Sequence, residues 1–198
     1  MLRRPLLIGS LACMAGAHAD ANADNRADAA ANDAAAALLR TGGLVLAMRH
    51  ALAPGTFDPP QFKLGDCSTQ RNLSDEGRAQ ARRIGQWLAS RQLQPAAVRS
   101  SPWCRCMETA TLAFGKADPW AALGSPRGAS EGTNAESLQA LTQAVEAASR
   151  VPGRFDVWVT HQFVLNDVVG VSTSAGEGLL LRAGPDRTLR VLTRLLVA

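Results

Sequence analysis

Two short apolar runs in this chain each end at a histidine. The run Leu44-Val45-Leu46-Ala47-Met48 precedes Arg49-His50, and the run Val157-Trp158-Val159-Thr160 precedes His161. Short runs rich in branched apolar residues are typical of strands that are buried in an α/β sheet. Ligands of open α/β sheets bind beyond the carboxyl ends of the strands. Two imidazoles at such ends, one of them beside an arginine, therefore indicate a site for an anion.

Helical periodicity follows each of these strands. Ser74 is expected to cap a helix that ends near Ser90, because Asp75 and Glu76 would lie in its first turn. The apolar face of this helix is Gly77, Ala81, Ile84 and Leu88. The pattern also predicts helices over 105–114, through Leu138, Leu141, Val145 and Ala148, and over 162–170, with strands over 96–98, 179–181 and 189–192. This order of elements predicts an α/β fold.

The amino-terminal segment is predicted to be a signal peptide of residues 1–19. Arg3 and Arg4 precede a short uncharged apolar run, and Ala17-His18-Ala19 fits the small-x-small rule for cleavage after Ala19. The run is too short to span a bilayer as a helix, and no other segment is a candidate for a membrane span. A lipoprotein signal at Cys13 is disfavoured, because Ser10 stands where an aliphatic residue is expected. We therefore expect a periplasmic or secreted protein.

The remaining chain is predicted to have two parts. Residues 20–40 consist largely of Ala, Asp and Asn, so we expect a partly flexible, low-complexity leader with at most a short helix over 33–39. Residues 41–198 form the expected single domain, and a hydrophobic content of 46% is enough for a core. Without Arg3 and Arg4 the formal net charge falls from +4 to +2, which argues against a nucleic-acid partner.

Three cysteines remain after the expected cleavage: Cys67, Cys104 and Cys106. Export implies an oxidising compartment, and an odd number leaves at least one free thiol. Cys104 and Cys106 are too close in sequence to make a good pair, so our hypothesis is a Cys67–Cys104 disulfide, with Cys67–Cys106 left open. A metal site is not expected, because the cysteines lack a paired C-x-x-C pattern.

The candidate chemistry is that of a phosphomonoester. Its oxygens need cations, for which arginine offers a planar fork. Its phosphorus needs a nucleophile, and a neutral imidazole has a free lone pair at neutral pH. The chain offers Arg49, His50, Arg105 and His161 for these roles.

Four segments in order resemble the motifs of the histidine phosphatase superfamily, which is also called phosphoglycerate-mutase-like. Met48-Arg49-His50-Ala51 resembles the Arg-His-Gly motif, and Arg71 to Gly77 resembles the Arg-Pro-Leu-Thr-x-x-Gly segment. Ser100 to Ala110 resembles Ser-Ser-Pro-x-x-Arg-x-x-x-Thr-Ala, and Val159-Thr160-His161-Gln162 resembles the strand that carries the second histidine. The resemblance extends from Leu44 to about Gly170.

This resemblance implies a three-layer α/β/α sandwich with a mostly parallel sheet. It also implies hydrolysis of a phosphomonoester through a phosphohistidine, without a metal or cofactor. His50 would be the nucleophile, and Arg49, Arg105 and His161 would hold the phosphoryl oxygens. Arg71 would help to bind the substrate.

The chain departs from the family pattern at two places. Ala51 replaces the usual glycine, a change that we expect the site to tolerate. The proton donor is the second departure, because the glutamate that many members carry before the third helix has no clear counterpart. We assign this role to Glu131, with Glu136 as a second candidate and Asp167 as a poorer one.

The export signal and the cysteine-containing loop resemble the branch that includes lipopolysaccharide-core heptose phosphatases. The expected partner is then a small phosphorylated substrate, such as a sugar phosphate or an envelope glycan, and phosphate or sulfate would be able to occupy the site. A mutase is disfavoured because no large insertion is present to close the site. The alternative is a noncatalytic module that binds phosphorylated glycans on the same fold.

Overall fold

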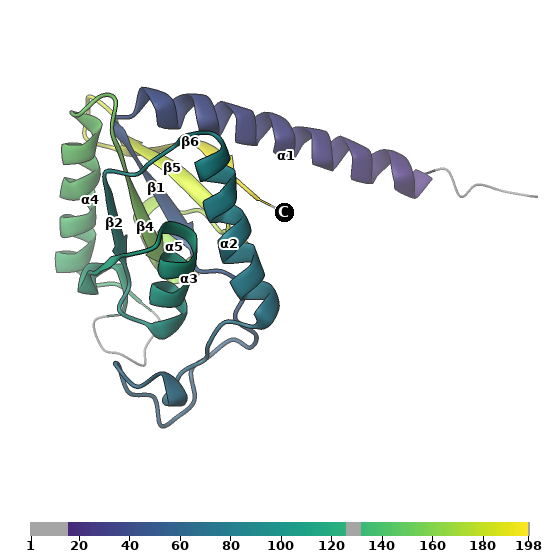
Figure 1. Cartoon of the computed structure of the whole chain (residues 1–198). Helices are drawn as coiled ribbons and strands as arrows, with labels where there is room; N and C mark the ends of the chain where they lie inside the picture. The colour runs from purple at the N-terminus through teal and green to yellow at the C-terminus, as the bar shows by residue number, and fades with distance from the viewer. Residues whose placement is uncertain (1–15, 126–131, 198) are drawn as a thin grey trace, which may run out of the picture.

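A six-stranded sheet forms the centre of the molecule. The computed structural model describes residues 16–125 and 132–197 (Figure 1). The strands are β1 (Leu44–Arg49), β2 (Ala97–Ser100), β3 (Asp118–Pro119), β4 (Phe155–Thr160), β5 (Gly178–Ala183) and β6 (Leu189–Leu195). Their order across the sheet is β3-β2-β4-β1-β5-β6. The first four strands of this order are parallel to one another. β5 pairs antiparallel with β1, and β6 pairs antiparallel with β5.

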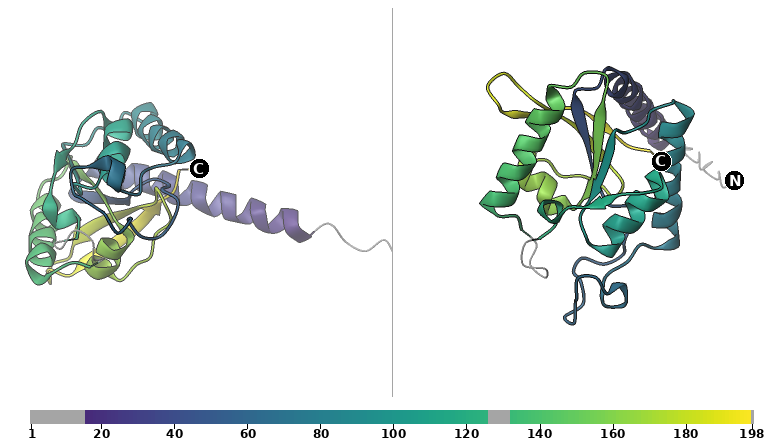
Figure 2. Two further views of the ribbon diagram at one scale, coloured as in Figure 1. Left: turned by 90° about the horizontal axis from the view of Figure 1, so that it is seen from below. Right: turned by 60° about the vertical axis from the view of Figure 1, so that its left-hand side comes forward.

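Helices cover both faces of the sheet (Figure 2). Helices α1 (Gly16–Thr41), α2 (Asp75–Ser90) and α3 (Cys104–Phe114) pack on one face, and α4 (Ala135–Ser149) and α5 (Gln162–Val169) pack on the other. Two short 3₁₀ turns, η1 (Cys67–Thr69) and η2 (Ala121–Leu123), complete the described elements. This arrangement confirms the predicted three-layer α/β/α fold with a mostly parallel sheet.

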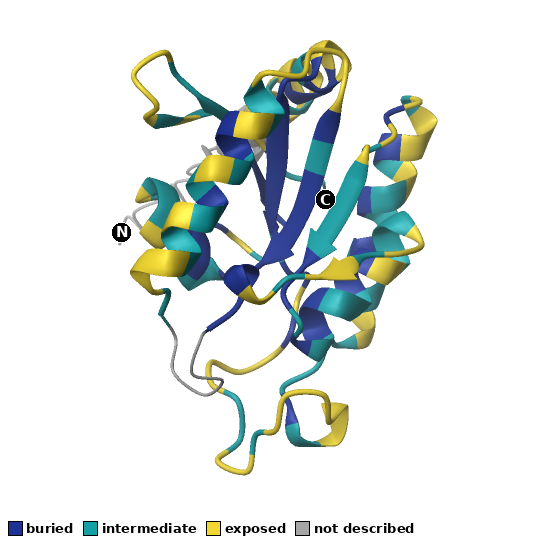
Figure 3. Cartoon of the chain, turned by 90° about the vertical axis from the view of Figure 1, so that its left-hand side faces the viewer, coloured by how far each residue is buried: buried dark blue, intermediate teal, exposed yellow. Residues whose placement is uncertain are grey.

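The first strand shows why its sequence is an unbroken apolar run. Leu44, Leu46 and Met48 face the core under α1, α2 and α3, whereas Val45 and Ala47 face the core under α4 and α5. All five side chains are fully buried. A strand with cores on both sides has no solvent-facing position for a polar residue. Figure 3 shows this buried centre, with β1 and β4 flanked by helices.

Helix α2 follows its sequence prediction closely. The Ser74 hydroxyl accepts a hydrogen bond from the Gly77 N–H at 3.0 Å, which caps the helix as expected. The predicted face is the buried one. At Gly77 a Cβ atom would lie 2.0 Å from the carbonyl oxygen of Leu52, so the helix approaches the loop after β1 only because this residue is glycine.

The two carboxyl-terminal strands lie where they were predicted, and both are longer than predicted. β5 pairs with β1, and β6 is the edge strand beyond it. The two-residue strand β3 and the 3₁₀ turns were not predicted, because elements this short carry no periodic signal.

The prediction for the leader needs correction, because α1 is helical from Gly16 to Thr41 rather than over 33–39. Alanine has the highest helix propensity, so a composition that is poor for a core is still good for a helix. Near its carboxyl end, Ala35 and Leu39 are buried, and Asn32 makes two hydrogen bonds to the backbone of Leu196. The helix therefore covers β6, and its amino-terminal half extends away from the body (Figure 1). No helix in the described part of the chain is both long and apolar enough to cross a membrane.

The loop after β1, residues 51–70, is largely exposed (Figure 3) and is tied to α3 by a disulfide. Cys67 and Cys104 form this bond, with their Cα atoms 5.6 Å apart, as the sequence hypothesis proposed. Cys106 is free and buried. Because Cys104 is the first residue of α3, the bond holds the long loop against the start of that helix.

Removal of the disulfide is expected to destabilise the protein. The bond joins residues 37 positions apart, and the loss of such a cross-link costs about 4 kcal/mol in chain entropy. The double variant Cys67→Ala/Cys104→Ala should therefore unfold at a clearly lower denaturant concentration than the wild type. Cys106→Ala, which changes only the free cysteine, is the control for thiol loss. Equal unfolding midpoints for the double variant and the wild type would contradict the structural role of this bond.

Candidate active site

The parallel pairing of β1 with β4 brings the two histidines together. Arg49 is in register with Thr160, and the backbone N–H of His50 donates to the carbonyl oxygen of Thr160 at 2.9 Å. His50 and His161 therefore follow their strands at the same level of the sheet. Their ring centroids are 5.6 Å apart, and both side chains are buried.

A pocket of about 200 Å³ opens at these strand ends. It is lined by Arg49, His50, Gly55, Thr56, Arg71, Arg105, His161, Gln162 and Phe163. Five residues that the sequence selected thus meet in one pocket, from four separate segments of the chain. Of the predicted catalytic and substrate-binding residues, only Glu131 is not placed there, because it lies outside the described residues.

The hydrogen bond of His50 determines which ring nitrogen is free. Nδ1 of His50 lies 2.8 Å from the carbonyl oxygen of Ala51. A carbonyl oxygen can only accept, so Nδ1 carries the proton and Nε2 carries the lone pair. The imidazole is thereby held in one tautomer with a nucleophilic nitrogen at Nε2.

Both histidines are neutral at physiological pH. Burial, followed by the positive charge of Arg105, lowers the pKa of His50 from 6.5 to about 3. The same two causes, in the same order, hold the pKa of His161 well below 6.5. A cation in this pocket would be desolvated and would lie beside other cations, so the neutral form is favoured.

His161 is positioned by its neighbours. Nδ1 lies 3.4 Å from Nη2 of Arg105, and Nε2 lies 2.7 Å from the hydroxyl of Ser101. Since a guanidinium only donates, this network assigns the proton to Nε2, with Ser101 as acceptor. The ring stacks on Phe163 with centroids 5.1 Å apart. Ser101 and Phe163 therefore fix the plane of the imidazole.

Arg49 and Arg71 are anchored through hydrogen bonds to backbone carbonyl groups. Nη1 of Arg49 donates to the carbonyl oxygen of Thr173 at 2.8 Å, and Thr173 is held in turn by Gln162. Nη1 of Arg71 donates to the carbonyl oxygen of Ala53. Such contacts orient each guanidinium at the pocket.

Arg105 lies in the first turn of α3 and is almost fully buried. Its Nη1 donates to both carboxylate oxygens of Asp58, at 2.9 and 3.1 Å. Its Nε is buried and has no hydrogen-bond partner in the described part of the chain. A buried donor without a partner is costly, so this atom is suited to an anion oxygen. Asp58 was not predicted from the sequence, because nothing in an irregular loop shows where its carboxylate will fold.

The alanine that replaces the family's glycine is accommodated. Ala51 is fully buried in a small apolar cluster with Ala53, Leu73 and Ala81. Its N–H donates to the hydroxyl of Thr109 on α3 at 3.1 Å. The methyl group therefore occupies a packed position, as expected for a tolerated change.

The proton donor stays a prediction. Glu136 is exposed in the first turn of α4, and it does not line the pocket. The carboxylate of Asp167 is exposed and accepts hydrogen bonds from the hydroxyl and N–H of Thr133, at 2.6 and 3.1 Å. Neither residue replaces Glu131 as a candidate.

The buried thiol beside the site is not a nucleophile. Sγ of Cys106 lies 3.6 Å from Nε2 of His161, and burial raises the pKa of this thiol to about 12. Among residues 16–125 and 132–197, no group of three or more His, Cys, Asp or Glu side chains is placed to hold a metal ion. The titratable and charged side chains that line the described pocket are therefore imidazoles and guanidinium groups.

Solved structures share this fold. A protein histidine phosphatase SixA complexed with tungstate has a TM-score of 0.54 at 15% identity, over 77% of this chain and 96% of that chain. A phosphoserine phosphatase from Entamoeba histolytica has a TM-score of 0.57 at 10% identity, over 76% and 95%. A mycobacterial glucosyl-3-phosphoglycerate phosphatase has a TM-score of 0.51 at 16% identity, over 76% and 97%. At these identities the likeness concerns the fold alone.

Part of the chain also matches a protein-family model in sequence. No curated protein is similar enough in sequence to match the chain. Residues 45–123 match the model of the histidine phosphatase superfamily (branch 1), a range that includes His50, Arg71 and Arg105. His161 lies beyond this range, and the structure places it beside His50. The chain is therefore similar to the histidine phosphatase superfamily in the sequence of residues 45–123, and it shares its fold with solved phosphatases of low sequence identity.

Proposed function

We propose that this protein hydrolyses a phosphomonoester through a phosphohistidine at His50. The observation that carries the proposal is the His50 side chain itself. Its Nδ1–H donates a hydrogen bond to the carbonyl oxygen of Ala51, and its ring lines a pocket that three arginines also line. An imidazole with a fixed tautomer and a free Nε2 lone pair is suited to attack phosphorus.

The charges of the pocket match a phosphate dianion. Arg49, Arg71 and Arg105 contribute three positive charges, and Asp58 offsets one of them. A phosphomonoester carries about two negative charges at neutral pH, so a pocket lined by these guanidinium groups suits it. Arginine also provides the planar donor geometry that phosphoryl oxygens accept. The donor Nε of Arg105, buried without a partner, is the atom that we assign to one of these oxygens.

The reaction proceeds in two transfers. Nε2 of His50 forms a bond to phosphorus while the bond from phosphorus to the leaving oxygen breaks, and that oxygen takes a proton from an acid, for which Glu131 is our candidate. Water then attacks the phosphorus and gives a proton back to that carboxylate, the bond to Nε2 breaks, and inorganic phosphate leaves. The phosphoryl dianion offsets the positive charge of the arginines while it is bound. The arginines stabilise the charge that develops during each transfer.

The proposed substrate is a small phosphorylated compound that the protein meets outside the cytoplasm. Two observations support export: the basic and apolar amino-terminal segment and the Cys67–Cys104 disulfide, a bond that is rare in cytosolic proteins. Within the proposed periplasmic or secreted setting, a sugar phosphate or a phosphorylated envelope glycan is the substrate class that we favour.

The nucleophile can be tested by trapping the intermediate. The wild type and His50→Ala are incubated with a ³²P-labelled phosphomonoester and quenched in denaturant at alkaline pH. Acid-labile label should remain on the wild type and be absent from His50→Ala, since of the two histidines at the pocket it is His50 whose Nε2 carries the lone pair. The variant should still bind inorganic phosphate, because it keeps all three arginines.

Two results would contradict the proposal. Equal labelling of both proteins would refute His50 as the nucleophile. A wild type that binds inorganic phosphate but neither takes up label nor turns over any of a broad set of phosphomonoesters would favour a noncatalytic binding module.

The low pKa of His50 predicts a loss of stability in acid. In the unfolded chain His50 takes up a proton below pH 6.5, whereas in the folded protein it stays neutral down to about pH 3. The free energy of unfolding is therefore unaffected by the protonation of this residue above pH 6.5 and falls as the pH falls toward 3. The loss is about 2 kcal/mol at pH 5. Denaturant unfolding at pH 7.5 and pH 5 should show this loss, and it should be smaller in His50→Asn. An equal pH dependence of the free energy of unfolding in both proteins would show that His50 is not held buried and neutral.

Export can be tested from the amino terminus of the mature protein. The full chain, expressed in a bacterium and recovered from the periplasmic fraction or the medium, should begin at Asp20 by mass spectrometry. An intact chain confined to the cytoplasm would refute the proposed signal peptide.

A further inference from the structure

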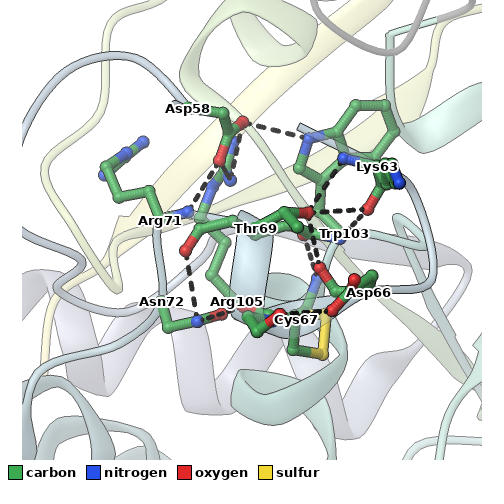
Figure 4. The surroundings of a disulfide bond; sticks show 12 residues. Asp58, Lys63, Asp66, Cys67, Thr69, Arg71, Asn72, Trp103 and Arg105 are labelled. Carbon is green, nitrogen blue, oxygen red and sulfur yellow. Dashed lines mark hydrogen bonds and ion pairs between the residues drawn. A yellow bond between two sulfur atoms is a disulfide. The ribbon is translucent and has the colours of Figure 1, made fainter. Parts of the chain in front are cut away.

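The carboxylate of Asp58 connects three parts of the molecule (Figure 4). Oδ1 accepts hydrogen bonds from the backbone N–H of Arg71 at 2.9 Å and from Nη1 of Arg105 at 2.9 Å. Oδ2 accepts from the indole N–H of Trp103 at 3.2 Å and again from Nη1 of Arg105 at 3.1 Å. Both oxygens of this one side chain, on the loop after β1, are therefore occupied by protein donors.

These contacts fix the guanidinium of Arg105. Asp58 holds Nη1, and His161 lies against Nη2 at 3.4 Å. The side chains of Arg105 and Asp58 are only 3% and 12% exposed, so the pair is screened little by water. Of this guanidinium, Nε is the atom that is buried without a partner among the described residues, and Arg105 lines the pocket. The orientation of that donor thus depends on the Asp58 carboxylate.

Asp58 is held in place by its surroundings. The loop is bonded to α3 by the Cys67–Cys104 disulfide, and Oε1 of Gln70 accepts the N–H of Cys104 at 3.0 Å. The ring of Phe62 stacks on Trp103 with centroids 5.5 Å apart. Three different interactions therefore tie the segment around Asp58 to the beginning of the helix that carries Arg105. The carboxylate is a fixed counter-ion rather than a mobile surface group.

The geometry disfavours two other roles for this residue. Asp58 does not line the pocket, and its oxygens are directed at donors on α3 and at Arg71, so it is badly placed to protonate a leaving group. A carboxylate that simply competed with the substrate for Arg105 would not need additional bonds to Trp103 and the backbone of Arg71. These bonds keep it in place whether or not the pocket holds an anion.

We propose that Asp58 is a positioning residue, which orients Arg105 so that its Nε receives a phosphoryl oxygen. This inference rests on the proposed phosphatase function, and it concerns a residue that acts through Arg105 rather than on the substrate. The same carboxylate also accepts a hydrogen bond from the backbone N–H of Arg71.

A double-mutant cycle on anion binding tests this role. The dissociation constant of inorganic phosphate is measured by calorimetry for the wild type, Asp58→Ala, Arg105→Gln and the double variant. Asp58→Ala should weaken phosphate binding about 10-fold in the presence of Arg105, because the donor loses its orientation. In the Arg105→Gln background the same change should have only about a 2-fold effect, since the guanidinium of Arg105 is gone and only the bond from the backbone N–H of Arg71 to Asp58 remains.

Asp66→Ala is the matched control, because Asp66 lies on the same loop but its side chain bonds only to Ser68. This variant should bind phosphate as the wild type does. Asp58→Asn, which keeps one oxygen but loses the charge, should lie between the wild type and Asp58→Ala. Thermal unfolding of each variant separates a misfolded protein from a misoriented arginine, and the isosteric Asn variant gives a second reading if the Ala variant does not fold.

Three results would overturn the proposal. They are tighter phosphate binding in Asp58→Ala, an equal loss in both Arg105 backgrounds, and an effect of Asp66→Ala as large as that of Asp58→Ala. Loss of turnover in Asp58→Asn with phosphate binding unchanged would also overturn it, since that result is expected of a proton donor. Phosphate binding is read without turnover, so failure of this cycle is distinguishable from failure of the trapping experiment at His50.

Discussion

The site depends on the hydrogen-bonded register between β1 and β4. Because these strands are parallel and Arg49 is paired with Thr160, the residues that follow them leave the sheet side by side. The two imidazoles need no specific contact with each other to meet, since the sheet sets their separation. Every other part of the pocket is arranged around this pair. The strands themselves are held by apolar cores on both faces, so the site is built at the ends of strands that are buried on both sides.

A second constraint is the burial of positive charge beside these rings. Three guanidinium groups line a small pocket, and the protein limits the resulting repulsion in two ways. It keeps both histidines neutral, and it places Asp58 against the most buried arginine. The disulfide then holds the loop that carries this carboxylate. Anion binding and the stability of this region are thus linked through one network of charges.

The sequence was most informative where local pattern and tertiary structure agree. The apolar runs before His50 and His161 predicted buried strands, and the cap at Ser74 predicted the start of α2, because each signal depends on neighbouring residues. The order of the motifs also predicted that Arg71 and Arg105 would join the site, and the structure places both at the pocket.

The sequence was less informative where distant segments meet. The length of α1 was underestimated because its alanines carry little apolar periodicity, and the packing of its end against Leu196 is a long-range contact. The role of Asp58 depends on how a 20-residue loop folds against α3, which no local pattern encodes. The proton donor is a similar case, since Glu131 was chosen without a motif and lies outside the described residues.

A structure of the protein with vanadate bound would show whether Nε2 of His50 is the attacking atom. Vanadate adopts the five-coordinate geometry of a phosphoryl group in transfer, so its position reports the attacking atom. We predict a bond from vanadium to Nε2 of His50, with vanadate oxygens that accept hydrogen bonds from Nε of Arg105 and from Arg49. Vanadate bound in the pocket with Nε2 of His50 directed away from the metal would contradict this prediction.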